Sequence, residues 1–168
     1  MAAGKILSLL AGILTIVATF MLSWVSVAVP PTDYAYGIGI VKNLPAMFTN
    51  ADALGALLGI PGFAIYIIAG ILIVFLLSGI FQLIGMKSRA LAIIGSIFVL
   101  LIGILTLLGL LNIVINIDWV INIFGDSVPI IDGIIPFDLV LGPASLGLYV
   151  LIAGGVLGLI AGFMGRGL

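Results

Sequence analysis

Four long runs of apolar residues divide the chain, and each run is long enough to cross a lipid bilayer as a helix. About 20 apolar residues, at 1.5 Å each, span the roughly 30 Å hydrocarbon layer. The predicted spans are residues 6–29, 63–86, 90–111 and 144–164. The first run exceeds the roughly 7–15 apolar residues of a secretory signal, so we expect it to be retained. Only a few residues separate the second and third runs, which predicts an antiparallel pair of helices.

Between the first two runs, residues 30–62 predict a strand followed by a short helix. Large and small side chains alternate over residues 34–41, which is typical of a strand with one crowded face. That face would carry Tyr34, Tyr36, Ile38 and Ile40. Farther along, Thr49 or Asn50 can cap a short helix that runs to Leu58.

Between the last two runs, residues 112–143 also favour extended structure. Isoleucine or tryptophan occupies every second position from Ile113 to Ile123, which predicts a strand outside the bilayer. The alternative is a helical extension of the third run. Farther on, Asp132-Gly133 is a favoured two-residue turn, and its flanking isoleucines predict a short hairpin.

Together these segments predict one integral membrane domain over residues 1–168. Its fold class is membrane α-helical, with a four-helix transmembrane bundle at its centre. The outer segments, residues 30–62 and 112–143, are expected to build a small extracytoplasmic β-sheet and a short helix. Backbone groups near lipid must be hydrogen-bonded, which favours a sheet over irregular loops.

The charges at the ends of the runs predict the orientation. One set of run ends carries Lys5, Lys87, Arg89 and Arg166. The other set carries Asp33, Asp52, Asp118, Asp126, Asp132 and Asp138, with Lys42 among them. Because cationic residues are retained on the cytoplasmic side, both termini are expected to be cytoplasmic in a multi-pass protein of the cell membrane. Four aromatic residues are expected in the outer headgroup layer: Trp24, Tyr66, Trp119 and Tyr149.

Composition supports the membrane class and narrows the chemistry. The chain is 64% hydrophobic and 7% charged, which leaves too little polar surface to coat a soluble globule of 168 residues. It contains no cysteine and no histidine, so thiol nucleophiles, imidazole catalysis and zinc sites of the usual type are excluded. The spans carry no internal ionisable residue, which argues against ion-coupled transport. The outer aspartates follow no calcium-loop spacing, so we expect no metal site. We also expect no enzymatic activity and no cofactor.

Small residues form stripes on two of the predicted helices. The fourth span carries Gly147, Gly154, Gly158 and Gly162 on one side, and the first span carries Gly4, Ser8 and Gly12. Such stripes let helices approach closely in lipid, where packing replaces the hydrophobic drive. The stripe of the fourth span predicts a helix-packing interface, either within the bundle or between molecules.

The order of elements resembles the claudin-type four-span families. Shared features are four spans, internal termini, a longer first outer loop and strands from both outer loops. The resemblance is one of topology, because the Trp, Gly-Leu-Trp and paired-cysteine motif of those families is absent from the first loop. It implies a role in lateral assembly or membrane organisation.

The leading functional hypothesis is a non-enzymatic structural or accessory membrane protein. It would act through the glycine stripe of the fourth span and through an outer contact face made of Tyr34, Tyr36, Ile38, Ile40 and Trp119. Expected partners are membrane lipid and either further copies or other membrane proteins, with no nucleic acid. One alternative is a pore or carrier for a small neutral solute, lined by Thr15, Thr19 and Ser23. Another is a cofactor-free subunit of a membrane enzyme complex.

Overall fold

The computed structural model describes residues 3–28, 32–113 and 115–164, which fold mostly as helices. The elements in chain order are α1 (Ala3–Phe20), β1 (Val25–Val27), β2 (Asp33–Ala35), α2 (Gly37–Thr49), α3 (Ala51–Leu58), α4 (Gly62–Ile84), α5 (Arg89–Leu110), α6 (Ile117–Phe124), β3 (Gly125–Asp126), β4 (Val140–Leu141), β5 (Ala144–Ser145) and α7 (Leu146–Phe163). In this part of the chain, α1, α4, α5 and α7 are long and apolar enough to cross a membrane. The prediction of four such helices is confirmed.

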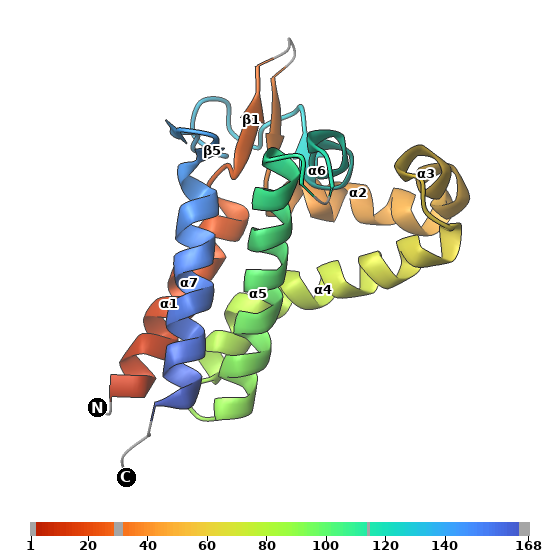
Figure 1. Cartoon of the computed structure of the whole chain (residues 1–168). Helices are drawn as coiled ribbons and strands as arrows, with labels where there is room; N and C mark the ends of the chain where they lie inside the picture. Colours follow the sequence, from red (N-terminus) through yellow and green to blue (C-terminus); the bar gives the residue numbers. More distant parts are fainter. Residues whose placement is uncertain (1–2, 29–31, 114, 165–168) are drawn as a thin grey trace.

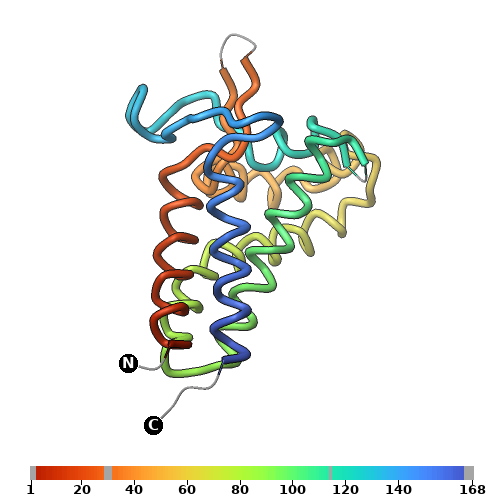
Figure 2. Tube along the Cα trace, turned by 60° about the vertical axis from the view of Figure 1, so that its left-hand side comes forward, coloured from red at the N-terminus to blue at the C-terminus, as the bar shows by residue number. Residues whose placement is uncertain are grey.

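The four long helices form a bundle that is open on one side (Figure 1). Helix α7 packs along both α1 and α5, and α4 contacts α1 and α5 in turn. Helix α4 lies beside α5 at its C-terminal end, near the short turn after Ile84. Toward its N-terminal end it diverges from α5 (Figures 1 and 2). Helices α2 and α3 lie against the half of α4 that has diverged. Both chain termini emerge at the end of the bundle where α4 turns into α5.

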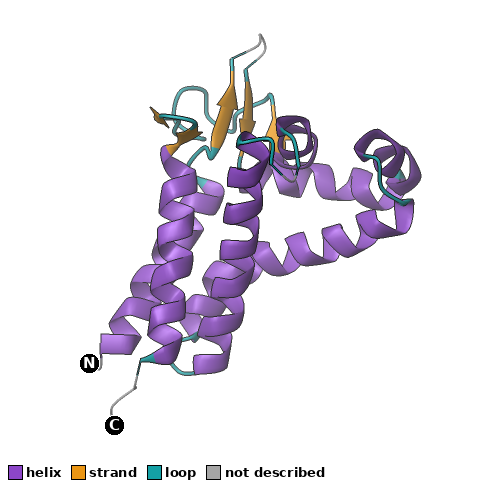
Figure 3. Cartoon of the chain, viewed as in Figure 1, coloured by secondary structure: helices purple, strands orange, loops and turns teal. Residues whose placement is uncertain are grey.

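The strands gather at the opposite end of the bundle (Figure 3). One antiparallel sheet has the order β1-β2-β3, and a second pairs β4 with β5. Strands from both outer segments therefore meet, which confirms the predicted small sheet. Helix α3 confirms the predicted short helix, with Asn50 at its N-cap position but without a side-chain capping bond.

The first helix ends well before the predicted residue 29. Helix α1 ends at Phe20, and the chain then continues as extended backbone into β1. The indole Nε1 of Trp24 donates to the carbonyl of Ala18 at 2.7 Å, so it satisfies one of the free carbonyls at the helix end. The backbone of Phe137 exchanges bonds with Met21 and Ser23, at 2.8 and 3.0 Å. Contacts from distant parts of the chain thus replace the last turns of the predicted span.

The predicted strand over residues 34–41 is confirmed only for Tyr34 and Ala35 of β2, because residues 37–41 begin helix α2. Buried positions follow helical spacing, at Tyr36, Ile40 and Met47. The alternation of large and small residues has another cause, since glycine is needed at position 39. A Cβ there would lie 2.7 Å from the carbonyl carbon of Phe124. The small residues mark a close approach between backbones and not one face of a strand.

The predicted strand over residues 112–123 is also wrong, and so is the alternative of a continuous helix. Asn112 adopts a left-handed conformation with φ 52°, which ends the turn after α5. Asn116 then caps the separate helix α6, because its side chain accepts a bond from Trp119 N at 3.1 Å. Apolar residues are so dense here that they fit both periods, and the two asparagines decide between them.

The predicted Asp-Gly turn is present, but its arms are short. Ile131 and Ile135 exchange backbone hydrogen bonds of 3.2 and 2.8 Å around it. Gly133 has φ 70°, a conformation that favours glycine. The pairing amounts to an isolated bridge between these isoleucines, since the prolines on either side lack the N–H group that a longer ladder needs.

Candidate functional site

The glycine stripe of α7 lies inside the molecule. A Cβ at Gly154 would lie 2.7 Å from the Thr15 hydroxyl of α1, and one at Gly158 would lie 2.7 Å from Gln82 Nε2 of α4. The remaining members, Gly147 and Gly162, are likewise buried, against the segment after α1 and against α5. The stripe is therefore covered by the helices of the chain itself.

The small residues of α1 serve two neighbours and not one. A Cβ at Gly4 would lie 3.3 Å from the carbonyl oxygen of Ala161 in α7. Ser8 instead donates to the carbonyl of Gln82 in α4 at 2.6 Å, and Gly12 faces α4 near Leu83. These residues bring α1, α4 and α7 together at the end of the bundle that carries the termini.

The buried polar side chains lie where helices pack, and the Thr15 and Thr19 hydroxyls have no hydrogen-bond partner among the described residues. Gln82 Nε2 donates to the Ser96 hydroxyl at 3.0 Å and to the carbonyl of Gly154 at 3.4 Å. Thr15 lies against α7, whereas Thr19 lies against Gly37 of α2. Ser23 bonds to its own neighbour Val25. The row proposed to line a pore is thus divided among three different contacts.

The predicted outer contact face is wrong. Tyr36 and Ile40 are buried, because α2 turns them toward the core. Tyr34 and Ile38 are half-buried on different elements. Trp119 is also half-buried, and it lines a cavity described below. These five residues do not form one surface.

The aromatic residues expected in the headgroup layer divide into two groups. Tyr66 and Tyr149 are exposed, and the Tyr149 hydroxyl donates to the Leu141 carbonyl at 2.8 Å. Trp24 is fully buried and contacts two phenylalanines edge-on, so its expected place at an interface is wrong.

The cationic side chains that predict orientation lie at one end of the bundle. Lys5 is in the first turns of α1, and Lys87 and Arg89 lie where α4 turns into α5, at the end that carries both termini. Arg166 is outside the described residues. Lys42, the cation predicted among the aspartates, is in α2 and pairs with Asp126 of β3.

A polar group joins α2 to the small sheet. Asp126 accepts bonds from the Lys42 ammonium at 2.5 Å and from the Tyr36 hydroxyl at 3.3 Å. Asn43 also donates to the carbonyls of Ile123 and Gly125, both at 3.1 Å. Burial raises the pKa of the Tyr36 phenol, and the charge of Asp126 and the hydrogen bond to it raise this pKa further.

This raised pKa predicts a loss of stability at alkaline pH. Above about pH 10 the unfolded chain releases the phenolic proton of Tyr36 while the folded chain retains it. The free energy of unfolding is therefore expected to be fully supported by this group below about pH 10 and to fall as pH rises beyond it. In Tyr36→Phe the free energy of unfolding is expected to fall less steeply with pH above about pH 10 than in the wild type. Unfolding at alkaline pH, monitored by phenolate absorbance, measures the two slopes. Identical slopes in both proteins would contradict the assignment.

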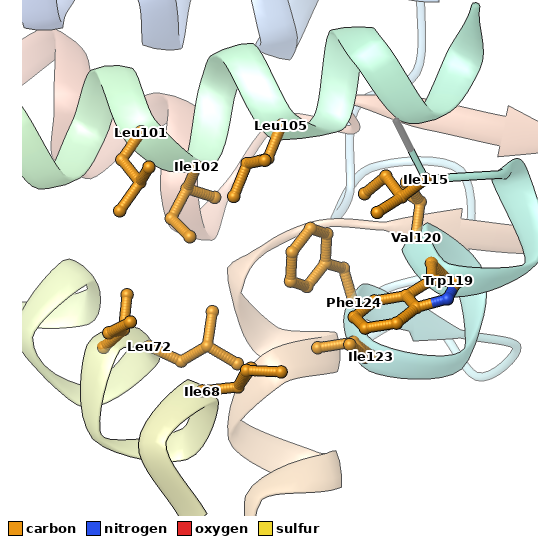
Figure 4. A pocket seen from close by; sticks show the side chains of 11 residues that line it. Ile68, Leu72, Leu101, Ile102, Leu105, Ile115, Trp119, Val120, Ile123 and Phe124 are labelled. Carbon is orange, nitrogen blue, oxygen red and sulfur yellow. The ribbon is translucent and has the colours of Figure 1, made fainter. Parts of the chain in front are cut away.

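A cavity of about 240 Å³ lies where α4 diverges from α5 (Figure 4). Apolar side chains line it from three directions. They are Ile68, Ile71 and Leu72 of α4, Leu101, Ile102 and Leu105 of α5, and Ile115, Trp119, Val120, Ile123 and Phe124 in and before α6. In Figure 4 these side chains point toward a common space. The apolar runs of the sequence gave no sign of it, because its lining comes from three separate segments.

The cavity exists because the two helices pack closely at one end and are held apart at the other. Near their shared turn, a Cβ at Gly95 of α5 would lie 2.7 Å from the carbonyl oxygen of Ser78 in α4. At the C-terminal end of α5, α6 packs against it closely: a Cβ at Gly109 would lie 2.6 Å from the Val120 side chain. Phe124 of α6 also contacts the core next to α4. Helix α6 thus packs against α5 and α2 and forms one wall of the cavity where α4 has diverged.

The lining of this cavity carries no charged side chain. No family model, curated protein or solved structure matches this chain. The resemblance to claudin-type families therefore stays a prediction. Within the described ranges, no three His, Cys, Asp or Glu side chains lie close enough together to hold a metal ion. What the cavity offers a ligand is apolar contact from eleven side chains.

Proposed function

We propose that this chain is a non-enzymatic integral membrane protein that binds an acyl chain of a membrane lipid between α4, α5 and α6. The observation that carries the proposal is the apolar cavity between two helices long enough to cross the bilayer. Water needs two to four polar partners to stay in a cavity, and these side chains offer none. Left empty, this space of about 240 Å³ would deprive its apolar lining of packing contacts.

The surroundings of the cavity favour a lipid chain as the occupant. Leu101 lines the cavity and is also exposed on the outside of α5, so the space is continuous with the outer surface of the bundle. Ile67 and Ile73 of α4 are exposed beside it. In a bilayer this surface contacts hydrocarbon, which is the nearest material able to enter.

The proposed orientation has both termini in the cytoplasm of a cell. It is supported by Lys5, Lys87 and Arg89 at the end of the bundle that carries the termini. The cavity, which is closed off by α6, then lies in the leaflet away from the cytoplasm. The biological role we propose is that of a non-enzymatic accessory component in a membrane assembly. Its lateral contacts would use the exposed apolar faces of the long helices, since the glycine stripe of α7 is covered within the chain.

Filling the cavity is expected to displace the lipid chain. Leu105→Trp puts a larger side chain into the space, and overpacking also disfavours any further occupant. We expect labelling by a phospholipid with a photoactivatable acyl chain to fall at least about tenfold, which corresponds to about 1.4 kcal/mol of binding free energy.

The matched control is Ile104→Trp, one residue along α5. Ile104 is exposed and is not part of the cavity lining, so the same change there is expected to leave labelling unaltered. Equal labelling of the two variants, in folded protein of equal melting temperature, would contradict binding in the cavity.

A further inference from the structure

A second hollow, of about 410 Å³, meets the apolar cavity at Trp119. The indole lines both spaces, and its nitrogen points away from the apolar side chains in Figure 4. The second hollow is polar on one side, where it is lined by Asn116, Asp118 and Asn122 of α6 and the residue before it. An apolar space and a polar one on the two sides of an amphipathic ring match the order of a lipid, chain first and head group last.

The free polar groups of this hollow are mainly hydrogen-bond acceptors. Asn116 Oδ1 accepts from the Trp119 backbone, and its Nδ2 donates to the Asp118 carboxylate at 3.5 Å. Asn122 Nδ2 donates to the Asp118 carbonyl at 2.8 Å. Each amide thus uses one N–H on α6 and keeps the other, while the carboxylate and amide oxygens also have acceptor capacity left.

The opposite wall adds negative potential. It consists of the last turn of α3, from Ala56 to its left-handed C-cap at Gly59, with φ 73°. The carboxyl end of a helix carries partial negative charge and favours cations. No Lys or Arg is among the described residues that line the hollow. The formal charge of the lining is that of the Asp118 carboxylate, which together with the end of α3 attracts a cation.

From these contacts we infer that the polar hollow holds the ammonium group of an amine-bearing phospholipid, whose acyl chain fills the apolar cavity. This inference rests on the proposed function and names the class of lipid. The ammonium contacts Asp118 and the end of α3, and the phosphate is left toward solvent. A phosphoglycerol head group brings hydroxyl donors but a net negative charge, so it is bound less well.

The test uses the full chain in nanodiscs of equal parts phosphatidylethanolamine and phosphatidylglycerol with identical acyl chains. Lipid retained on extraction into detergent is counted by native mass spectrometry. The wild type is expected to retain the ethanolamine lipid in roughly threefold excess, a size typical of a partly exposed ion pair. Asp118→Asn is expected to retain as much total lipid with that excess lost, and Asn122→Asp is expected to increase the excess.

Two controls separate this inference from the proposed function. Asp132→Asn, in the exposed turn far along the chain from α6, is expected to keep the wild-type excess. An unchanged excess in Asp118→Asn, or equal retention of the two lipids by the wild type, would overturn the head-group assignment and leave chain binding intact. Total lipid unchanged in Leu105→Trp would instead overturn the chain-binding proposal itself.

Discussion

Gly158→Leu is expected to lower the free energy of unfolding by about 3 kcal/mol, at the upper end of the usual cost of overpacking. Even a Cβ at this position would lie 2.7 Å from Gln82 Nε2 and in contact with the Ser96 hydroxyl. Neither group can move freely. The Ser96 hydroxyl donates to the Ala92 carbonyl at 2.6 Å, and Gln82 donates to both Ser96 and Gly154.

The loss would also leave polar groups unpaired. Gln82 Oε1 already lacks a partner among the described residues, so pushing the amide away from Ser96 would expose a second unsatisfied group to an apolar interior. Unfolding of purified protein in mixed detergent, followed by size-exclusion chromatography after heating, measures the change.

The control for this prediction is Gly70→Leu on α4. A Cβ at Gly70 would meet nothing within 4 Å, and the position is exposed on the outside of the bundle. Replacing a helical glycine there is expected to leave stability unchanged or to raise it by up to about 1 kcal/mol. Equal losses in the two variants would mean that the glycine stripe does not determine helix packing.

The long helices could be predicted from the sequence because their signal is local. A run of about 20 apolar residues has few alternatives to a helix in lipid, and α4 and α5 begin and end within about two residues of their predicted bounds. For the first run, the predicted helix is wrong only beyond Phe20, where α1 ends. What ends it there is pairing with Phe137, a contact between distant segments that no local pattern reveals.

Prediction is poorest around residues 113–123 of the outer segments, because isoleucine, valine or tryptophan fills most positions there. Where apolar residues are so dense, helical and strand spacing both find matches, and the side chains that decide are asparagines and glycines. Asn116 as a cap and Gly39 as a point of close approach were both visible in the sequence. The buried residues Tyr36, Ile40 and Met47 have helical spacing, which becomes apparent only when the segment is followed beyond residue 41.

The cavity could not be predicted at all, because it results from the angle between α4 and α5. Its lining residues look like any other apolar residue of a span. The sequence predicts Trp119 as part of an outer contact face, whereas it lines the cavity. Strand spacing would place Asp118 and Asn122 on the face opposite Trp119, whereas α6 places all three in the lining of the polar hollow.

Trp24→Ala is expected to be among the most damaging single substitutions in the chain, with a loss of about 3–5 kcal/mol in the free energy of unfolding. Trp24 is fully buried where three helices meet. Its ring contacts Phe75 of α4 and Phe124 of α6 edge-on, with centroids 5.7 and 5.8 Å away. Its indole also satisfies the Ala18 carbonyl at the end of α1. Truncation thus leaves a large void and frees a carbonyl together.

Two further variants divide this loss between its causes. Trp24→Phe retains most of the ring but removes the donor to Ala18, so it is expected to cost about 1–3 kcal/mol, the price of one unsatisfied buried carbonyl. Phe163→Ala removes an aromatic ring of which 75% is exposed, at the end of α7, and is expected to change stability by less than about 0.5 kcal/mol. If Phe163→Ala were as costly as Trp24→Ala, burial at the junction of α1, α4 and α6 would not explain the effect. Because Phe124 also lines the apolar cavity, the chain-binding proposal predicts that Trp24→Ala weakens acyl-chain labelling, since Phe124 loses the ring it packs against.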